Sequence, residues 1–206
     1  MANILILGAG TMGTAFSFPC SDNKHSVKVL GTHLENDFID KLNKTKIHPT
    51  LKCNLPNKVE FLKFENLSKE IKNSVDLIVI AVISKGIEWA SFELSKLIKK
   101  NIPILILTKG LSINDNKYEI LADKMERILK KNGVKETNIS AAGGPCLAKD
   151  LAGRAHTSVI FANKNIEVVK QIKRLVSTDY YHIFLSDDVA GVEICAAIKN
   201  IFAMAV

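Results

Sequence analysis

The sequence predicts an α/β protein built on a doubly wound parallel β-sheet. Three observations predict this class: continuous apolar runs, helical patterns between them, and a glycine-rich turn directly after the first run. Apolar runs without alternation are typical of strands that are buried on both faces of a parallel sheet. Helical segments between such strands form the crossover connections. With 206 residues, the chain is long enough for one such domain and part of a second.

The first half of the chain contains four predicted strands, each an apolar run rich in β-branched residues. They are Asn3–Leu7, Val27–Leu30, Asp76–Val82 and Ile104–Leu107. Two helices are predicted where apolar residues recur at helical spacing, at Ile87–Lys100 and Tyr118–Lys131. Both segments end in lysines, which complement the negative end of a helix dipole.

The second half continues the alternation. Strands are predicted at Ile139–Ala142, Thr157–Ala162 and His182–Leu185, and a helix at Ile166–Val176. The last tract is helical and apolar on nearly all sides, so it needs neighbours on several sides. We therefore expect residues 1–187 to form the first domain. Residues 188–206 are expected to begin a second, all-helical domain that continues past Val206.

The composition argues against several other classes of protein. Hydrophobic residues make up 47% and charged residues 24%, which is typical of a globular chain. The formal net charge is +7, but many lysines are interleaved with carboxylates in helix-like segments, which favours a solvated basic face over a nucleic-acid site. The last apolar tract contains Glu193 and Lys199. Because a charge at the centre of a bilayer costs about 2.5 to 3.5 kcal/mol, no membrane-spanning helix is expected.

The four cysteines are Cys20, Cys53, Cys146 and Cys195, and they are far apart in the sequence. None of them shows the Cys/His spacing that a metal site requires, so no metal is expected. Scattered, reduced thiols are typical of a cytoplasmic protein.

The glycine-rich turn at residues 8–13 reads Gly-Ala-Gly-Thr-Met-Gly and matches the GxGxxG pattern. In such a turn Gly8 permits the sharp bend, Gly10 lets the backbone approach a pyrophosphate, and Gly13 allows the next helix to pack closely. The amino end of that helix faces the phosphates. The pattern, directly after a strand, predicts a Rossmann-type fold that binds NAD or NADP.

The end of the second strand bears on the choice between these two cofactors. NAD-binding domains commonly place a carboxylate there, but residues 30–33 read Leu-Gly-Thr-His, and Glu35 comes later. His33, with Lys28 nearby, would tolerate a 2′-phosphate, although His33 is equally well an ordinary loop histidine. NADP is therefore at least as plausible as NAD.

Two lysines are candidates for chemistry. Lys109 follows a predicted buried strand, at the end where open α/β sheets bind ligands, although an ordinary turn lysine has the same pattern. Lys199 lies in the apolar terminal helix, where desolvation would lower its pKa and make it a usable acid or base. The alternative is a lysine whose stem lies along the helix while its amine reaches water.

Four motifs, at residues 8–15, 108–110, 143–150 and 191–201, occur in the order and spacing of the NAD(P)-dependent glycerol-3-phosphate dehydrogenases. The sequence resembles the N-terminal part of the bacterial type, and the similarity extends over the whole chain. The resemblance implies reversible hydride transfer between sn-glycerol 3-phosphate and NAD(P)+, which gives dihydroxyacetone phosphate and serves glycerophospholipid precursor synthesis. It implies a small phosphate-bearing substrate and a cytoplasmic enzyme, and it is compatible with a homodimer.

The resemblance also implies roles for individual residues. Lys199 matches the proton donor and acceptor, and Lys109 matches a lysine shared between cofactor and substrate. The other substrate-side positions are Gly144, Cys146 and Asn200. The cofactor-side positions are Gly8, Gly10, Thr11, Met12, Gly13, His33, Lys109 and Ala148.

The sequence also departs from the family's pattern. Leu147 replaces a usual phenylalanine, Ile83 stands where proline is usual, and Pro19 is expected to interrupt the first helix, at about 3 kcal/mol for an interior proline. The arginine and asparagine that hold the substrate phosphate in the family have no counterpart here. Loss of a bidentate arginine removes charge pairing and orientation, so we expect the chain to be a weak catalyst by itself.

Two other functions stay open. One is a dinucleotide-binding fragment without catalysis, and the other is a related dehydrogenase that acts on a 3-hydroxy acid. The motifs around Lys109 and Lys199 argue against the second, because such enzymes resemble this chain only at the glycine turn.

Overall fold

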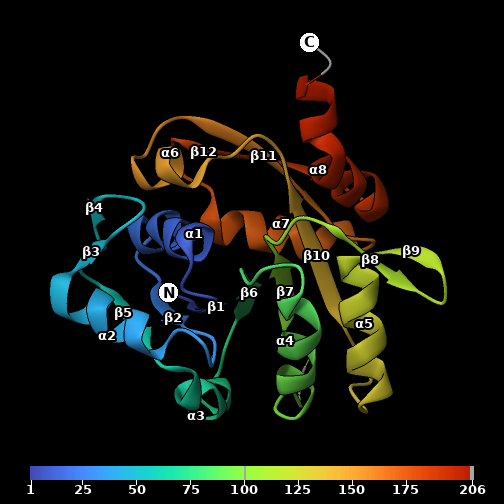
Figure 1. The fold of residues 1–206 in the computed structure, drawn as a ribbon, viewed down its shortest axis with the longest axis horizontal. Coiled ribbons are helices and arrows are strands. Elements are labelled where there is room, and N and C mark those ends of the chain that lie inside the picture. Colours follow the sequence, from blue (N-terminus) through green and yellow to red (C-terminus); the bar gives the residue numbers. More distant parts are fainter. Residues whose placement is uncertain (100, 205–206) are drawn as a thin grey trace.

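A central eight-stranded sheet organises the structure, a computed structural model that describes residues 1–99 and 101–204 (Figure 1). The strand order across the sheet is β12-β11-β10-β7-β6-β1-β2-β5. Its strands are β1 (Asn3–Leu7), β2 (Ser26–Leu30), β5 (Val59–Leu62), β6 (Leu77–Ile80), β7 (Pro103–Ile106), β10 (Asn138–Gly143), β11 (Thr157–Ala162) and β12 (Tyr181–Ser186). Two small antiparallel pairs lie outside it, β3 (Ile47–His48) with β4 (Cys53–Asn54) and β8 (Leu111–Asn114) with β9 (Lys117–Ile120).

Six neighbouring strands, from β10 to β5, are parallel, which confirms the doubly wound α/β fold. The chain builds outward from β1 through β2 to β5, and then returns to the other side of β1 to build β6, β7 and β10. The order of strands therefore reverses between β1 and β6, the place at which open α/β sheets bind ligands. At the far edge the sheet is mixed, because β11 pairs antiparallel with β10 and parallel with β12.

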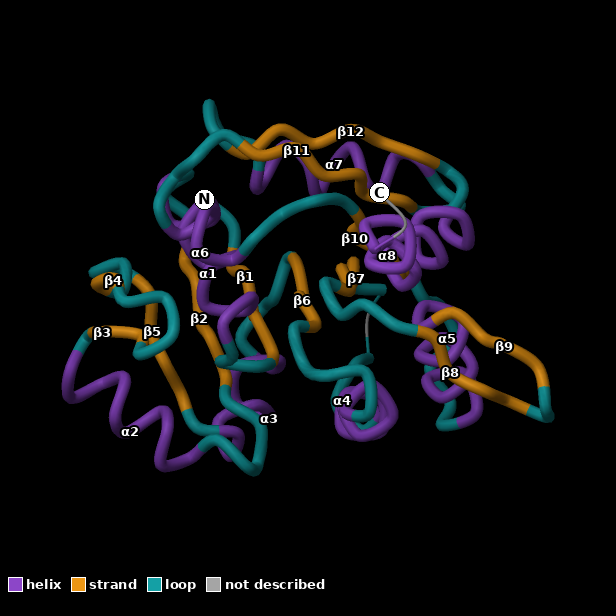
Figure 2. Tube along the Cα trace, turned by 45° about the horizontal axis from the view of Figure 1, so that its top comes forward, coloured by secondary structure: helices purple, strands orange, loops and turns teal. Residues whose placement is uncertain are grey.

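Helices cover both faces of the sheet (Figure 2). One face is covered by α1 (Thr11–Asp22), α2 (Asn36–Thr45), α6 (Ala148–Ala152) and α7 (Ile166–Val176). The other is covered by the short 3₁₀ turn Phe64–Asn66, α3 (Leu67–Lys72), α4 (Gly86–Ser95) and α5 (Leu121–Lys131). Along β1, Ile4 and Ile6 pack in the first layer while Leu5 and Leu7 pack in the second. Burial on both faces is why this strand is apolar without alternation.

The last helix, α8 (Val189–Met204), contacts β10 and projects away from the sheet (Figure 1). Its first turns pack against the second layer through Val189 and Val192. Within the described residues, the helices are too short or too polar to cross a membrane.

Two predicted helices have different bounds in the structure. The segment Tyr118–Ile120, predicted as helix, forms most of β9, and α5 begins only at Leu121. The reason is the turn before it: Asp115 and Asn116 both have positive φ, the conformation of a two-residue hairpin turn that asparagine and aspartate adopt readily. The helix predicted to reach Lys100 ends at Ser95, and Lys100 itself lies outside the described residues.

The expected interruption at Pro19 does not occur, because α1 continues from Thr11 to Asp22 with Pro19 buried inside it. Pro19 lies in the last turns of the helix, so the missing N–H removes a hydrogen bond near its end. The backbone N–H of Asn23 still donates to the Pro19 carbonyl, at 3.1 Å.

Candidate functional site

The glycine turn lies between β1 and α1, and two of its glycines are required by close packing. Gly8 has φ +110°, and a Cβ there would lie 2.6 Å from the Ala81 carbonyl oxygen. Its N–H donates to the Leu30 carbonyl at 2.8 Å, which ties the turn to the end of β2. A Cβ at Gly13 would collide with the carbonyl oxygen of Gly8. Both positions therefore exclude any larger residue.

Gly10 differs from its neighbours, because neither its backbone nor its packing requires glycine. Its φ is −63°, and a Cβ built there meets no atom within 4 Å. The open space lies where α1 begins, at Thr11 and Met12, and no side chain caps the helix. Unpaired backbone N–H groups at a helix start, beside free space, suit a phosphate group. The residues present therefore fit the pyrophosphate of a dinucleotide.

A groove of about 420 Å³ continues from Gly8 and Gly10 along the end of β2. The aromatic side chains of His33 and Trp89 line it, with ring centroids 4.8 Å apart. Phe64 packs behind Trp89 at a centroid distance of 4.9 Å. Apolar and aromatic walls of this kind suit a planar base.

Glu35 also lines the groove. The sequence did not predict this position, because Glu35 follows the end of the second strand by several residues. One of its carboxylate oxygens accepts the Thr32 N–H at 2.6 Å and the Ala9 N–H at 3.4 Å. The carboxylate therefore lies against the glycine turn, at the position where NAD-binding domains place an acid. The loop after β2 turns back over residues 32–35, where the Glu35 N–H donates to the Thr32 carbonyl at 3.0 Å. This turn brings a residue five positions beyond the strand to the end of the strand.

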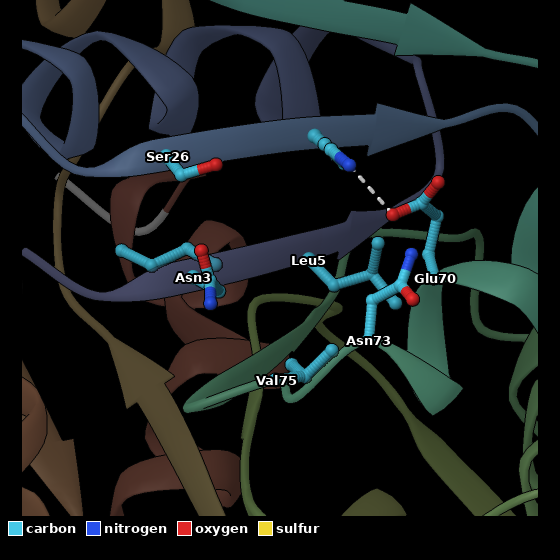
Figure 3. A pocket seen from close by; sticks show the side chains of 8 residues that line it. Asn3, Leu5, Ser26, Glu70, Asn73 and Val75 are labelled. Atoms are coloured by element: carbon cyan, nitrogen blue, oxygen red, sulfur yellow. Dashed lines mark hydrogen bonds and ion pairs between the residues drawn. The ribbon is translucent and has the colours of Figure 1, made fainter.

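Lys28, suggested as a partner for a 2′-phosphate, is engaged elsewhere. Its Nζ donates to Glu70 at 2.7 Å, the dashed contact beside Glu70 in Figure 3. The two groups line a separate small hollow beside Asn3 and Val75. This ion pair removes Lys28 from the groove, so the interpretation of a basic pair with His33 was wrong.

Lys109 follows β7 at the same carboxyl edge of the sheet. It is half-buried, and its Nζ donates to the Gly144 carbonyl at 3.2 Å. The Thr108 hydroxyl donates to the Val82 carbonyl at 2.6 Å, which fixes the turn that carries the lysine. Burial lowers the pKa of Lys109, and the positive charge of Lys199 lowers it further.

The loop after β10 completes this cluster. Cys146 is buried, and burial raises the pKa of its thiol, whereas the nearby positive charges of Lys109 and Lys199 act in the opposite direction. Ala148 begins α6 and is half-buried. Lys109 therefore lies against Gly144, and the charge of Lys199 acts on both Lys109 and Cys146.

Lys199 and Asn200 lie on α8. Lys199 is half-buried and Asn200 is exposed. The helix is held at Gly143 of β10, where a Cβ would lie 2.8 Å from Cγ1 of Val192. Close packing of α8 on this strand therefore requires glycine at position 143.

In the ranges 1–99 and 101–204, no group of three or more His, Cys, Asp or Glu side chains is arranged to hold a metal ion.

Comparison with known proteins identifies the family. Residues 3–169 match the family described as the N-terminus of NAD-dependent glycerol-3-phosphate dehydrogenase. The NADP(+)-dependent glycerol-3-phosphate dehydrogenase of Archaeoglobus fulgidus is 29% identical over 203 residues, which are 98% of this chain and 59% of that relative. The NAD(P)+ enzyme of Oceanobacillus iheyensis is 30% identical over 207 residues, which cover 99% of this chain and 57% of the relative.

A solved structure agrees in fold. Glycerol-3-phosphate dehydrogenase from Coxiella burnetii superposes with a TM-score of 0.83 at 24% identity, over 99% of this chain and 59% of the other. The chain thus spans a little under three fifths of the relatives it matches. By the family match over residues 3–169, it belongs to the NAD-dependent glycerol-3-phosphate dehydrogenase family.

Proposed function

We propose that the chain is the dinucleotide-binding part of a glycerol-3-phosphate dehydrogenase that interconverts sn-glycerol 3-phosphate and dihydroxyacetone phosphate with NAD(P)+. Such a reaction supplies the precursor of glycerophospholipids. One observation carries the proposal: the open groove at Gly10 and the Lys109–Lys199 pair lie on the same carboxyl edge of the sheet. The glycine turn lies at the switch in strand order between β1 and β6, and Lys109 follows β7, the strand beside β6. Ligands bind beside this switch in open α/β sheets.

The roles follow from the chemistry of the side chains. A bound nicotinamide dinucleotide supplies or accepts the hydride. Lys199 gives a proton to the substrate oxygen during reduction and takes it back during oxidation. Lys109 carries positive charge in a half-buried setting, where it steadies negative charge on the substrate more strongly than it would in water.

The remaining assignments are also proposals. Gly144, Cys146 and Asn200 are assigned to the substrate side, and Ala148 to the nicotinamide side. Residues 1–187 are assigned to the dinucleotide-binding domain and 188–206 to the start of a helical substrate domain. Exposed Ile201 and Met204 on α8 support that division, because apolar side chains of this size favour a covering partner. We expect a cytoplasmic protein, and a homodimer is an assembly to test.

The direct test is an assay of NADH oxidation with dihydroxyacetone phosphate, on the protein at its full natural length. The proposal expects saturable turnover with this ketone and none with 3-oxo acids. Dinucleotide binding without any turnover would favour the non-catalytic alternative. Turnover with a 3-oxo acid alone would favour the other dehydrogenase class.

The position of Glu35 leads to a prediction about the cofactor. We assign this carboxylate, which accepts the Thr32 and Ala9 N–H groups, to the ribose 2′-hydroxyl; in that role it would repel a 2′-phosphate. We expect NADH to bind at least tenfold more tightly than NADPH, a difference of about 1.4 kcal/mol. In Glu35→Gln the preference for NADH over NADPH should become smaller, mainly because NADPH binds more tightly.

Competitive fluorescence titration measures both affinities. Glu167→Gln, which removes an exposed carboxylate from α7, is the matched control and should leave the preference unchanged. Equal affinity for the two cofactors in the unmodified protein would overturn this assignment of Glu35.

A further inference from the structure

Glu193 is a buried carboxylate with no role in the function proposed above. It lies on α8 and is only 4% exposed. One oxygen accepts the Leu121 N–H at 2.5 Å, and the other accepts the Ala122 N–H at 3.1 Å. The contact joins residues about 70 positions apart, and it connects the helix that carries Lys199 to the start of α5.

The start of α5 lacks a cap of its own. The residue before the helix is Ile120, whose side chain cannot accept a hydrogen bond. The first N–H groups of a helix have no partner within it, and the amino end carries partial positive charge. Glu193 supplies both the acceptors and the negative charge that this end needs.

Keeping a carboxylate in this place is unfavourable by itself. Burial raises the pKa of Glu193 to about 7; the Leu121 and Ala122 N–H groups act against this rise, and the charge of Asp123 adds to it. An apolar residue would fill the space without the penalty of burying a charge. Unlike an apolar contact, the two hydrogen bonds of Glu193 require one geometry. They therefore fix one point of α8 against one point of α5.

The positions along α8 differ in burial. Val189 and Ala196 are buried and Val192 packs on Gly143, but Ile201 and Met204 are exposed. Lys199 lies six residues after Glu193, which is about 9 Å along a helix. Its ammonium group also lies close enough to Lys109 to lower the pKa of that lysine, and two like charges repel.

We propose that Glu193 is a positioning residue, whose carboxylate fixes α8 on the amino end of α5 and thereby keeps the Lys199 ammonium beside Lys109. The catalytic meaning of that placement depends on the function proposed above, but the placement itself does not. Without the anchor, repulsion between the lysines moves Lys199 outward.

The test measures the pKa of Lys109 directly and needs no turnover. NMR titration of the lysine side chains above pH 7, where Glu193 is ionised, gives this value, and Lys109→Arg assigns the signal. In Glu193→Gln we expect the Lys109 pKa to rise towards its ordinary value, because the charge of Lys199 has moved away. Loss of the negative charge of Glu193 would by itself lower the Lys109 pKa, whereas movement of Lys199 away would raise it. The direction of the shift therefore separates these two effects.

The Lys199→Met variant distinguishes the positioning of Lys199 by Glu193 from a general loss of packing around Lys109. Lys199→Met should raise the Lys109 pKa by itself, and adding Glu193→Gln to it should cause no further change. Glu167→Gln is the control for loss of a carboxylate elsewhere. If Glu193→Gln does not fold, Glu193→Asp, which keeps the charge but shortens the side chain, provides the same comparison.

Two results would overturn the proposal. One is an unchanged or lowered Lys109 pKa in Glu193→Gln, which would mean that Lys199 stays in place without its anchor. The other is an equal rise in the Lys199→Met background, which would mean that Glu193 only maintains packing around Lys109. The two proposals can fail separately. If the Lys109 pKa shifts as expected but the protein does not reduce dihydroxyacetone phosphate, the proposed dehydrogenase function is refuted and the positioning role of Glu193 stands.

Discussion

Replacing Lys199 with methionine is expected to reduce the turnover of dihydroxyacetone phosphate by about a hundredfold or more, the scale of general acid–base catalysis. Methionine keeps an unbranched apolar stem on α8 but has no proton to give. Affinity for NADH should barely change, because the glycine turn to which we assign the dinucleotide follows β1, two strands from β7 and Lys109. Steady-state kinetics on the protein at its full natural length, together with NADH titration, measures both quantities.

Lys109→Met provides the comparison for this result. Lys109 is assigned to both ligands, so its loss should lower kcat and raise KM for the ketone together. Near-normal turnover in Lys199→Met would refute the acid–base assignment. Equal losses of NADH binding and turnover would instead indicate that Lys199 supports the fold of α8.

The second large effect concerns Gly13. In Gly13→Ala the new methyl group would collide with the carbonyl oxygen of Gly8 and lie 3.0 Å from the Ala81 Cβ. The carbonyl belongs to the backbone of the turn and cannot move cheaply. We expect a loss of about 2 to 3 kcal/mol of stability, typical of overpacking. For a chain of this size that corresponds to a fall in Tm of roughly 5 to 10 °C.

Gly10→Ala is the matched control, because a Cβ at Gly10 meets no atom and its φ suits any residue. Its Tm should fall by no more than about 4 °C, since alanine is less favourable than glycine before a helix by at most about 1 kcal/mol. Thermal unfolding followed by circular dichroism compares the two variants. Similar Tm values for both would contradict the packing described for the turn.

The strands could be predicted because burial on both faces leaves a continuous apolar run in the sequence. The predicted strand Asn3–Leu7 and the predicted helix Ile166–Val176 have the same bounds in the structure. The segment Tyr118–Ile120 was predicted as helix because its apolar spacing continues into α5. The two positive φ values at Asp115 and Asn116 redirect the chain into a hairpin instead.

The site could be predicted where it depends on local backbone and not where it depends on long-range contacts. The turn at Gly8 to Gly13 follows from its neighbours in sequence. Glu35 could not be assigned in advance, since its reach to Ala9 depends on how the loop after β2 folds back. Glu193 was visible only as a charge in an apolar tract, because its partners, Leu121 and Ala122, lie about 70 residues earlier.

Titration of the unmodified protein and of Gly10→Val with NADH tests the central claim most directly, because Gly10 is the glycine of the GxGxxG turn that the packing of that turn does not require. Valine would fill the open space beside the start of α1, and the loss of pyrophosphate contact should weaken binding by at least about a hundredfold, or 2.7 kcal/mol. The Tm without ligand should fall little, so lost binding would not reflect unfolding. Unchanged NADH affinity in a folded Gly10→Val protein, or no NADH binding by the unmodified protein, would contradict the assignment of this groove to a dinucleotide.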